Sequence, residues 1–220
     1  NQLKTVAKFI SGGLKTNIYL VTLPGFDTHE YQVVSDESHL GDHASLLNEL
    51  STAVNSFIKD INNQGFINDV IAVTFSEFGR KAKENSNFGT DHGEVAPMFV
   101  FGKSIKPGII GTNVNLNEPN EENNFQLKTI QFDYRNIFSA VLQDWFGSGN
   151  SILDMSLYDN HLMSGFKNTI TKNIFKDEVI VPFNCYKNID NSVIEKIILF
   201  PNPCETYITV TSYEKMVSIY

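Results

Sequence analysis

Apolar residues recur at helical spacing in three parts of the chain. The clearest stretch lies between residues 46 and 61, where they repeat at i, i+3, i+4 and i+7, at Leu46, Leu47, Leu50, Ala53, Val54, Phe57, Ile58 and Ile61. Gly65 follows, as is typical of a helix C-terminus. Residues 3–13 read as a shorter helix that ends at a Gly-Gly pair, and Asp133 can cap a third helix running to about Phe146. The pattern therefore predicts three amphipathic helices.

Three short runs of apolar residues predict buried strands. They occupy residues 18–22, 70–75 and 97–102, and the first of them ends at Pro24-Gly25. The first two flank the long helix, and their composition is apolar almost throughout. Strands of that kind belong to parallel sheets that are covered on both faces. We therefore expect an α/β fold with a mostly parallel sheet, in which ligands bind beyond the carboxyl ends of the strands.

The second half of the chain has a different sequence pattern from the first. Residues 112–130 are rich in Asn and Glu and predict an exposed loop. Residues 169–196 read as a linker, because charged residues and Asn interrupt the short apolar runs there. Residues 197–220 predict two β-strands around a Pro turn, the beginning of a small β-domain. The expected organisation is an α/β domain over 1–168, the linker, and a truncated module over 197–220.

Composition and charge restrict the function classes. Hydrophobic residues make up 41% of the chain, with 17 Phe, which is ample for a packed core. The formal net charge of -8 argues against nucleic acid as a partner, because no basic stripe exists to neutralise phosphates. No apolar run reaches the roughly 18–20 residues of a transmembrane span. The chain opens at Asn1 without a signal-peptide pattern, which we interpret as a missing N-terminal part.

Two pairs of metal-ligand types stand next to predicted strands. Asp27 and His29 follow the first strand, two residues apart, and Asp91 and His92 lie between glycines before the third. Carboxylate oxygens and imidazole nitrogens are common ligands of divalent cations. Asp91 is either a ligand or the acceptor that orients His92. The alternative for the first pair is a turn in which Asp27 caps backbone groups and His29 is only solvated.

A third polar cluster follows the second predicted strand. Glu77 stands directly after the strand as a candidate ligand or base, and Arg80 as a candidate partner for an anionic substrate oxygen. An ordinary Glu–Arg surface pair is the alternative. His39 and His43, one turn apart before the long helix, fit the start of that helix better than a ligand role. Taken together, the clusters predict one metal-type site with five candidate ligands: Asp27, His29, Glu77, Asp91 and His92.

These clusters resemble the signature motifs of a known family. Gly-Phe-Asp-Thr-His at 25–29, Thr-Phe-Ser-Glu-Phe-Gly-Arg at 74–80 and Gly-Thr-Asp-His-Gly at 89–93 are similar to those of the bacterial domain-of-unknown-function family fifteen-oh-one. That family is grouped with the alkaline phosphatase and sulfatase superfamily. The resemblance covers roughly residues 1–147. It implies an alkaline-phosphatase-like three-layer sandwich, incomplete in this chain, and a metal-supported ester hydrolase.

The resemblance also implies roles for individual residues. Asp27 and His29 match the first ligand pair of the superfamily, and His92 matches its last ligand. The second pair, Asp-His in the superfamily, is replaced here by Glu77 and Phe78. Because Phe78 removes a nitrogen ligand, a single metal of the sulfatase kind, or an altered centre, fits better than a two-zinc centre. Zinc or calcium is the expected cation, with magnesium or manganese as further alternatives, and the nucleophile is expected upstream of this chain.

The tail resembles a second family. Leu199-Phe200-Pro201-Asn202-Pro203 followed by a strand is similar to the opening of the C-terminal sorting domain of the type-nine secretion system in Bacteroidetes-type bacteria. This resemblance implies contact with the type-nine secretion machinery and export across the outer membrane. The expected location is therefore secreted or on the cell surface.

Two functions of different classes remain at this point. The first is a secreted, metal-dependent hydrolase whose substrate is an anionic phosphate or sulfate ester. The second is a non-catalytic surface or scaffold domain that keeps the fold and a structural metal. In either case we expect isolated residues 1–220 to be poorly soluble and inactive, because the sheet would have an unpaired edge.

Overall fold

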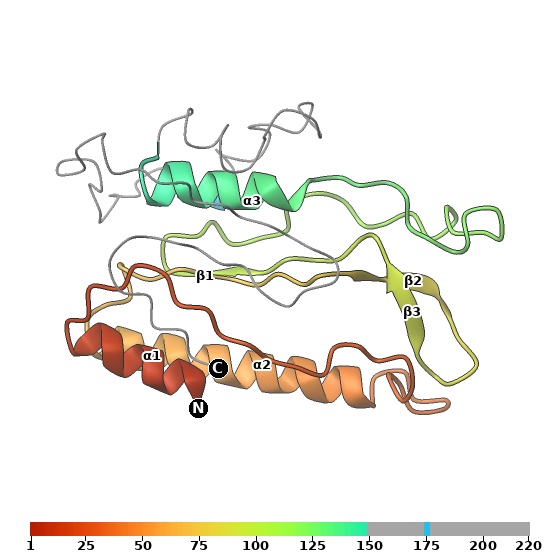
Figure 1. Cartoon of the computed structure of the whole chain (residues 1–220), viewed down its shortest axis with the longest axis horizontal. Coiled ribbons are helices and arrows are strands. Elements are labelled where there is room, and N and C mark those ends of the chain that lie inside the picture. Colours follow the sequence, from red (N-terminus) through yellow and green to blue (C-terminus); the bar gives the residue numbers. More distant parts are fainter. Residues whose placement is uncertain (149–173, 177–220) are drawn as a thin grey trace.

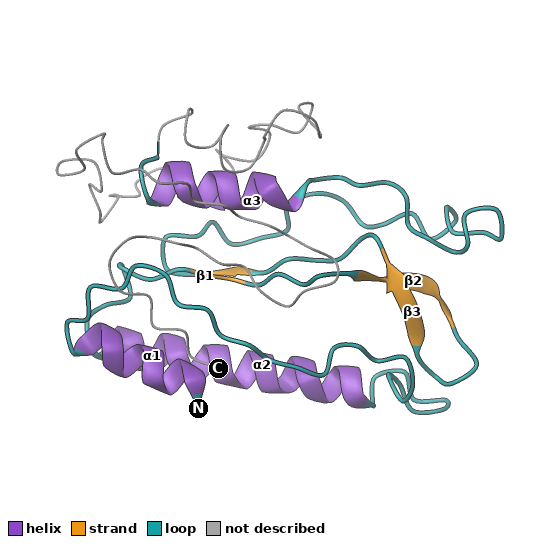
Figure 2. Ribbon diagram, viewed as in Figure 1, coloured by secondary structure: helices purple, strands orange, loops and turns teal. Residues whose placement is uncertain are grey.

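The structure of the chain is a computed structural model that describes residues 1–148 and 174–176. Its helices are α1 (Gln2–Ser11), α2 (Asp42–Asn63) and α3 (Tyr134–Ala140), the last continued by the π-helical turn η1 (Val141–Trp145). Its strands, all between α2 and α3, are β1 (Ala72–Val73), β2 (Gly79–Glu84), β3 (Thr90–Gly93) and β4 (Val100–Phe101). Helices α1 and α2 lie on one side of β1, and α3 lies on the other (Figure 1, Figure 2). The three predicted helices are confirmed.

The first hydrophobic core lies between α1 and α2. Val6 and Ala7 of α1 pack with Phe57 and Ile61 of α2, and all four are buried. Phe57 and Ile61 belong to the apolar stripe that predicted the long helix. Burying a side chain of this size stabilises the fold by about 1.5–3 kcal/mol relative to leaving it exposed. Amphipathic packing therefore explains why this long segment is helical.

The segment that enters β1 is covered on both faces. Val70 packs against the α1–α2 core, whereas Ile71 packs against a second core around Ala140 and Trp145. This alternation follows from the strand geometry, in which successive side chains point to opposite faces. Two-sided burial explains why the run 70–75 is apolar at nearly every position.

Both ladders in the part of the chain that the structure describes are antiparallel. β1 pairs with β4, with Ala72 opposite Phe101 and Val73 opposite Val100. β2 pairs with β3 to form a hairpin that projects beyond the helices (Figure 1). The runs at 70–75 and 97–102 thus contain strands as predicted. The mostly parallel sheet and the three-layer sandwich stay predictions.

The segment at 18–22 has the side-chain alternation of a strand but no strand assignment. Tyr19 and Val21 pack against the α1–α2 core, while Ile18 and Leu20 are about half exposed, at 54% and 47%. The side chain of Gln2 bonds both the N–H and the carbonyl of Thr22, each at 3.1 Å. A strand is defined by pairing with a neighbour, and no neighbour pairs with 18–22 among the described residues.

Beyond α3, two residues of the predicted linker are packed into the second core. Ile174 and Phe175 are buried, and the Phe175 ring stacks on Trp145 with centroids 6.2 Å apart. Lys106 N donates to Ile174 O at 2.8 Å, so this piece of 169–196 runs beside residues 104–106. The predicted loop at 112–130 is confirmed as irregular and largely exposed. The rest of the linker and the whole of 197–220 lie outside the described residues.

No helix in residues 1–148 or 174–176 combines the length and the apolar composition that crossing a membrane requires. This agrees with the sequence, in which no apolar run is long enough for such a span.

The predicted cap of α3 is confirmed. Asp133, 7% exposed, accepts a hydrogen bond from Arg135 N at 2.9 Å, and its two carboxylate oxygens also accept from the Arg135 guanidinium, at 2.8 and 2.6 Å. Burial acts to raise the pKa of Asp133, but the hydrogen bonds from Arg135 outweigh it and the pKa lies below its usual value. Asp133 is therefore held as a carboxylate at the helix N-terminus.

A pH-dependent loss of stability is expected from this cap. A carboxyl group whose folded pKa is lowered contributes stability above its unfolded pKa, and that contribution is lost as pH falls through the folded pKa. The Asp133→Asn variant keeps an acceptor for Arg135 N but loses the charge. We expect it to be about 1–2 kcal/mol less stable than the parent at pH 7, with the difference shrinking as pH falls through the lowered pKa of Asp133. Urea unfolding at stepped pH measures this, and a difference that persists unchanged at low pH contradicts it.

Candidate metal centre

The β2–β3 hairpin carries one half of the candidate site. Arg80 of β2 stands opposite His92 of β3, and Gly79 stands opposite Gly93. Gly89, just before β3, lies so close to the carbonyl of His29 that a Cβ at this position would collide with it. Glycine therefore allows the hairpin to press directly against the loop that follows Pro24-Gly25.

Hydrogen bonds fix this loop to the hairpin. Gln32 Oε1 accepts from both threonines that face each other across the junction, Thr28 Oγ1 at 3.0 Å and Thr90 Oγ1 at 2.7 Å. Asn85 Nδ2 donates to His29 O at 2.7 Å. The sequence did not point to Gln32 or Asn85, because contacts 56 and 58 residues apart leave no trace in local spacing.

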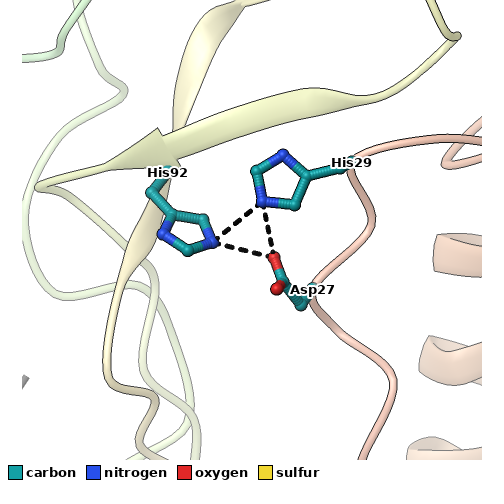
Figure 3. Close-up of side chains that lie close together, drawn as sticks. All are labelled: Asp27, His29 and His92. Carbon is teal, nitrogen blue, oxygen red and sulfur yellow. Dashed lines mark hydrogen bonds and ion pairs between the residues drawn. The ribbon is translucent and has the colours of Figure 1, made fainter. Parts of the chain in front are cut away.

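Asp27, His29 and His92 converge at this junction (Figure 3). Their ligand atoms form a nearly equilateral triangle: His29 Nε2 to Asp27 Oδ1 is 3.0 Å, His92 Nε2 to Asp27 Oδ1 is 2.8 Å, and the two Nε2 atoms are 3.0 Å apart. The three side chains are 55%, 47% and 48% exposed. The structure thus brings together three of the five predicted ligands, with an outer face open to solvent.

This triangle fits a divalent cation. These three atoms would hold a cation such as zinc, whose bonds to nitrogen and oxygen ligands are about 2.0–2.2 Å long. Two imidazole nitrogens and one carboxylate oxygen are a donor set that zinc and other transition metals use. The remaining coordination positions would point to solvent. Three protein ligands with an open position are typical of catalytic zinc sites, whereas structural zinc sites are closed by four.

Asp91 lies behind the triangle. Its carboxylate is 3.7 Å from His29 Nδ1, the ring nitrogen that faces away from the candidate metal position, and 3.3 Å from Lys81 Nζ. The hydrogen bond from Lys81 is the main cause that lowers the pKa of Asp91. An anion beside Nδ1 favours a proton on that nitrogen, which leaves Nε2 free to bind a metal. Of the two roles predicted for Asp91, the geometry favours orienting an imidazole, and that imidazole is His29.

Arg80 holds the loop and the hairpin together. Its Nη2 donates to Phe26 O at 2.6 Å and to Asp27 Oδ1 at 2.9 Å, and its Nη1 donates to Thr90 O at 2.8 Å. The guanidinium is thus engaged by the protein itself, and contact between Arg80 and a substrate oxygen stays a prediction. Hydrogen bonding with His92 is the main cause that lowers the pKa of Asp27, and the bond from Arg80 adds to it. Asp27 is therefore ionised, as a metal ligand must be.

Phe78 is packed against the site. Its ring stacks on His92 with centroids 3.7 Å apart and an interplanar angle of 14°. The Arg80 guanidinium lies 5.2 Å from the centre of the same ring. Phe78 thus fixes the plane of the His92 imidazole.

Three further polar residues do not belong to the triangle. They are Glu77 and two histidines near the start of α2. Glu77 Oε2 accepts from Ser76 Oγ at 3.3 Å, and Glu77 is not one of the three residues whose ligand atoms converge. Its roles as ligand and base stay predictions. His43 belongs to the first turn of α2, where its ring meets Phe26 edge-on at 6.0 Å, and His39 is exposed. His43 thus belongs to the start of the helix as expected, whereas His39 lies in the turn before it.

Two imidazoles and a carboxylate at the junction of a loop and a hairpin define a protein with a candidate metal-binding site. Residues 14–150 match the family described as "Protein of unknown function (DUF1501)", and the chain belongs to that family. All three polar clusters lie inside the matched region. No curated protein and no solved structure matches the chain. The predicted family is thus confirmed, while the superfamily and the sorting domain stay predictions.

Proposed function

We propose that the chain carries the metal-binding part of a secreted hydrolase of phosphate or sulfate esters. Asp27, His29 and His92 would hold one divalent cation. The observation that carries the proposal is the open triangle of three ligand atoms, with sides of 2.8–3.0 Å and one face exposed to solvent. Such an arrangement leaves room for a substrate oxygen, which a closed structural site does not.

The donor set favours zinc among the expected cations. Calcium and magnesium prefer oxygen ligands, and calcium takes six to eight of them. Here two of the three donors are imidazole nitrogens, which suit zinc better than calcium, magnesium or manganese. The proposal is therefore one transition metal per chain, with zinc first.

The residues around the cation have separate tasks. When bound, the metal would supply Lewis acidity toward an ester oxygen and charge for the developing anion. Asp27 contributes the one negative ligand, and the hydrogen bond from Arg80 keeps it aimed at the triangle. Asp91 and Phe78 hold the imidazoles of His29 and His92 in place. The protein thereby fixes the ligand geometry before the cation or the substrate arrives.

Three further parts of the proposal rest on the resemblances of the sequence. The α/β sheet would be mostly parallel and belong to a three-layer sandwich of the alkaline phosphatase kind. Export would use the type-nine secretion machinery, because the Leu199–Pro203 motif follows a linker-like stretch. The protein would then act at the cell surface or outside the cell.

Ester hydrolysis tests the proposed activity. The protein, expressed from its complete reading frame and loaded with zinc, is expected to hydrolyse members of a panel of aryl phosphates and aryl sulfates. The His92→Ala variant should lose that turnover by at least about 100-fold, whereas His39→Ala should retain it. Equal turnover by the parent and His92→Ala would rule out this site as the source of the activity.

A non-catalytic scaffold domain is the second candidate. The observation that favours it is Phe78, whose ring stacks on His92 where the superfamily pattern places a ligand. This candidate predicts that zinc binds and stabilises the fold while no ester in the panel is turned over. Metal binding with turnover supports the hydrolase, and metal binding without turnover across the panel supports the scaffold.

A further inference from the structure

A cavity of about 360 Å³ adjoins the candidate metal position. Asp27 and His29 form part of its wall, so the cavity begins where the triangle of ligand atoms ends. Small-molecule sites have volumes of roughly 300–1,000 Å³. A substrate whose anionic group lies at the triangle would therefore extend the rest of its structure into this cavity.

The lining of the cavity argues against an anion inside it. Two acidic residues, Glu30 and Asp42, line it, and no lysine or arginine does so among the described residues. Asp42 stands at the N-terminus of α2, but its N–H already donates to Tyr31 O at 3.0 Å, and the next N–H, of His43, donates to Gln32 O at 3.3 Å. The helix terminus is thus both negatively charged and largely satisfied. An anionic group is repelled here, and a neutral one is not.

An exposed tyrosine is held at this cavity by its backbone. Tyr31 N donates to Asn87 O at 3.1 Å, Tyr31 O accepts from Asp42 N, and the residue has a positive φ of 53°. The side chain is free of the core, and the residue is 66% exposed. The backbone of Tyr31 therefore needs no further ordering on binding, and its side chain offers a flat apolar ring with a hydroxyl at its tip.

The polar groups beside this ring suit hydroxyl groups. Carboxylates accept hydrogen bonds, while the Asn87 amide and the Tyr31 hydroxyl both donate and accept, as a ligand with several hydroxyls requires. A quaternary ammonium group would call for a cage of several aromatic rings. Among the described residues that line this cavity, Tyr31 is the single tyrosine, and none is a phenylalanine or a tryptophan.

From this lining we infer that the cavity beside the metal position receives a sugar or polyol, the alcohol part of the ester, with Tyr31 as its stacking surface. The inference rests on the proposed function for the ester itself. The cavity's preference for a neutral, hydroxyl-rich group follows from its own lining.

The inference is tested with esters that share one anionic group and differ in the alcohol part. With the zinc-loaded, complete protein, kcat/KM for a methyl glucoside 6-phosphate should exceed that for ethyl phosphate and for phosphocholine by at least about 10-fold. If sulfate is the group cleaved, the corresponding sulfate esters replace these. In the Tyr31→Gly variant the ratio of sugar ester to ethyl ester should fall about 10-fold. Glycine accepts the positive φ, so this variant removes the ring without adding backbone strain.

The matched control is Tyr134→Gly, which removes a tyrosine at the start of α3 that does not line the cavity and should leave the ratio at the parent value. Saturation-transfer NMR with plain methyl glucoside supplies a readout that needs no turnover. Binding of the glucoside that is lost in Tyr31→Gly supports the cavity assignment even if no ester is hydrolysed. Hydrolysis without a preference for the sugar ester, a preference for phosphocholine, or glucoside binding unchanged in Tyr31→Gly overturns it.

Discussion

Replacing His92 with alanine is expected to weaken zinc binding by more than about 100-fold, because even the loss of a residue that only supports a ligand costs about 10–100-fold. His92 supplies one of the three atoms of the triangle, 2.8 Å from Asp27 Oδ1 and 3.0 Å from His29 Nε2. With two ligands left, the cation keeps one imidazole and one carboxylate. Isothermal titration calorimetry of zinc into the metal-free protein measures the change.

The matched control for this result is His39→Ala. His39 is an exposed histidine that is not part of the triangle, so its loss should leave the zinc affinity of the site unchanged. A chain whose zinc affinity falls equally in both variants binds zinc through scattered surface histidines. A chain whose affinity falls in neither does not bind zinc at this site.

The second large effect is expected at Arg80. In the Arg80→Met variant, the carbonyls of Phe26 and Thr90 each lose a donor, at 2.6 and 2.8 Å, and the junction of loop and hairpin is weakened. We expect the free energy of unfolding to fall by about 2–3 kcal/mol. Zinc affinity should fall by about 10–100-fold, because Asp27 loses the partner that aims it. Urea unfolding and calorimetry on the same preparations measure the two effects.

Lys83→Met is the control for Arg80. Lys83 is on the same strand, but its ammonium lies 3.9 Å from the centre of the Phe125 ring, outside the metal site. Its loss should cost about 0.5–1 kcal/mol of stability and leave zinc binding intact. An Arg80→Met variant that binds zinc as tightly as Lys83→Met would show that Arg80 does not position Asp27.

The helices of the fold were predictable because their signals are local. The stripe that includes Phe57 and Ile61 places α2 with its buried face, and Asp133 marks the start of α3 through its cap. The strand at 70–75 was also predictable, since two-sided burial demands apolar residues throughout. The hairpin β2–β3 was not predicted. Its sequence, from Gly79 to Gly93, is polar and lacks the alternation on which strand prediction depends.

Which strands pair with each other was harder to predict than where the strands lie in the sequence. The apolar runs that contain β1 and β4 were found from composition, but their antiparallel register depends on contacts across 28 residues of chain. The segment 18–22 has the side-chain pattern of a strand but is not paired with any described segment. Its alternation of packed Tyr19 and exposed Leu20 is that of a strand, and yet the described residues offer it no partner. The local sequence can favour an extended backbone. The hydrogen-bonded ladder of a sheet also depends on a second segment, which the local sequence does not identify.

At the candidate site, too, local features were predictable from the sequence and long-range contacts were not. Asp27, His29 and His92 were predicted as ligands because their residue types and their places next to strands are local features. The task of Arg80 was not predicted, because its acceptors, Phe26 O and Thr90 O, belong to the backbone of two other segments. Any residue type provides a carbonyl, so the sequence carries no sign of such a contact.

The central claim is that Asp27, His29 and His92 hold one metal ion. Anomalous X-ray diffraction at the zinc edge, on crystals of the complete protein grown with zinc, tests it most directly. The account predicts one peak per chain, about 2.0–2.2 Å from His29 Nε2, His92 Nε2 and an oxygen of Asp27. A zinc-saturated crystal with no peak between these three side chains, or with zinc bound only elsewhere, contradicts it.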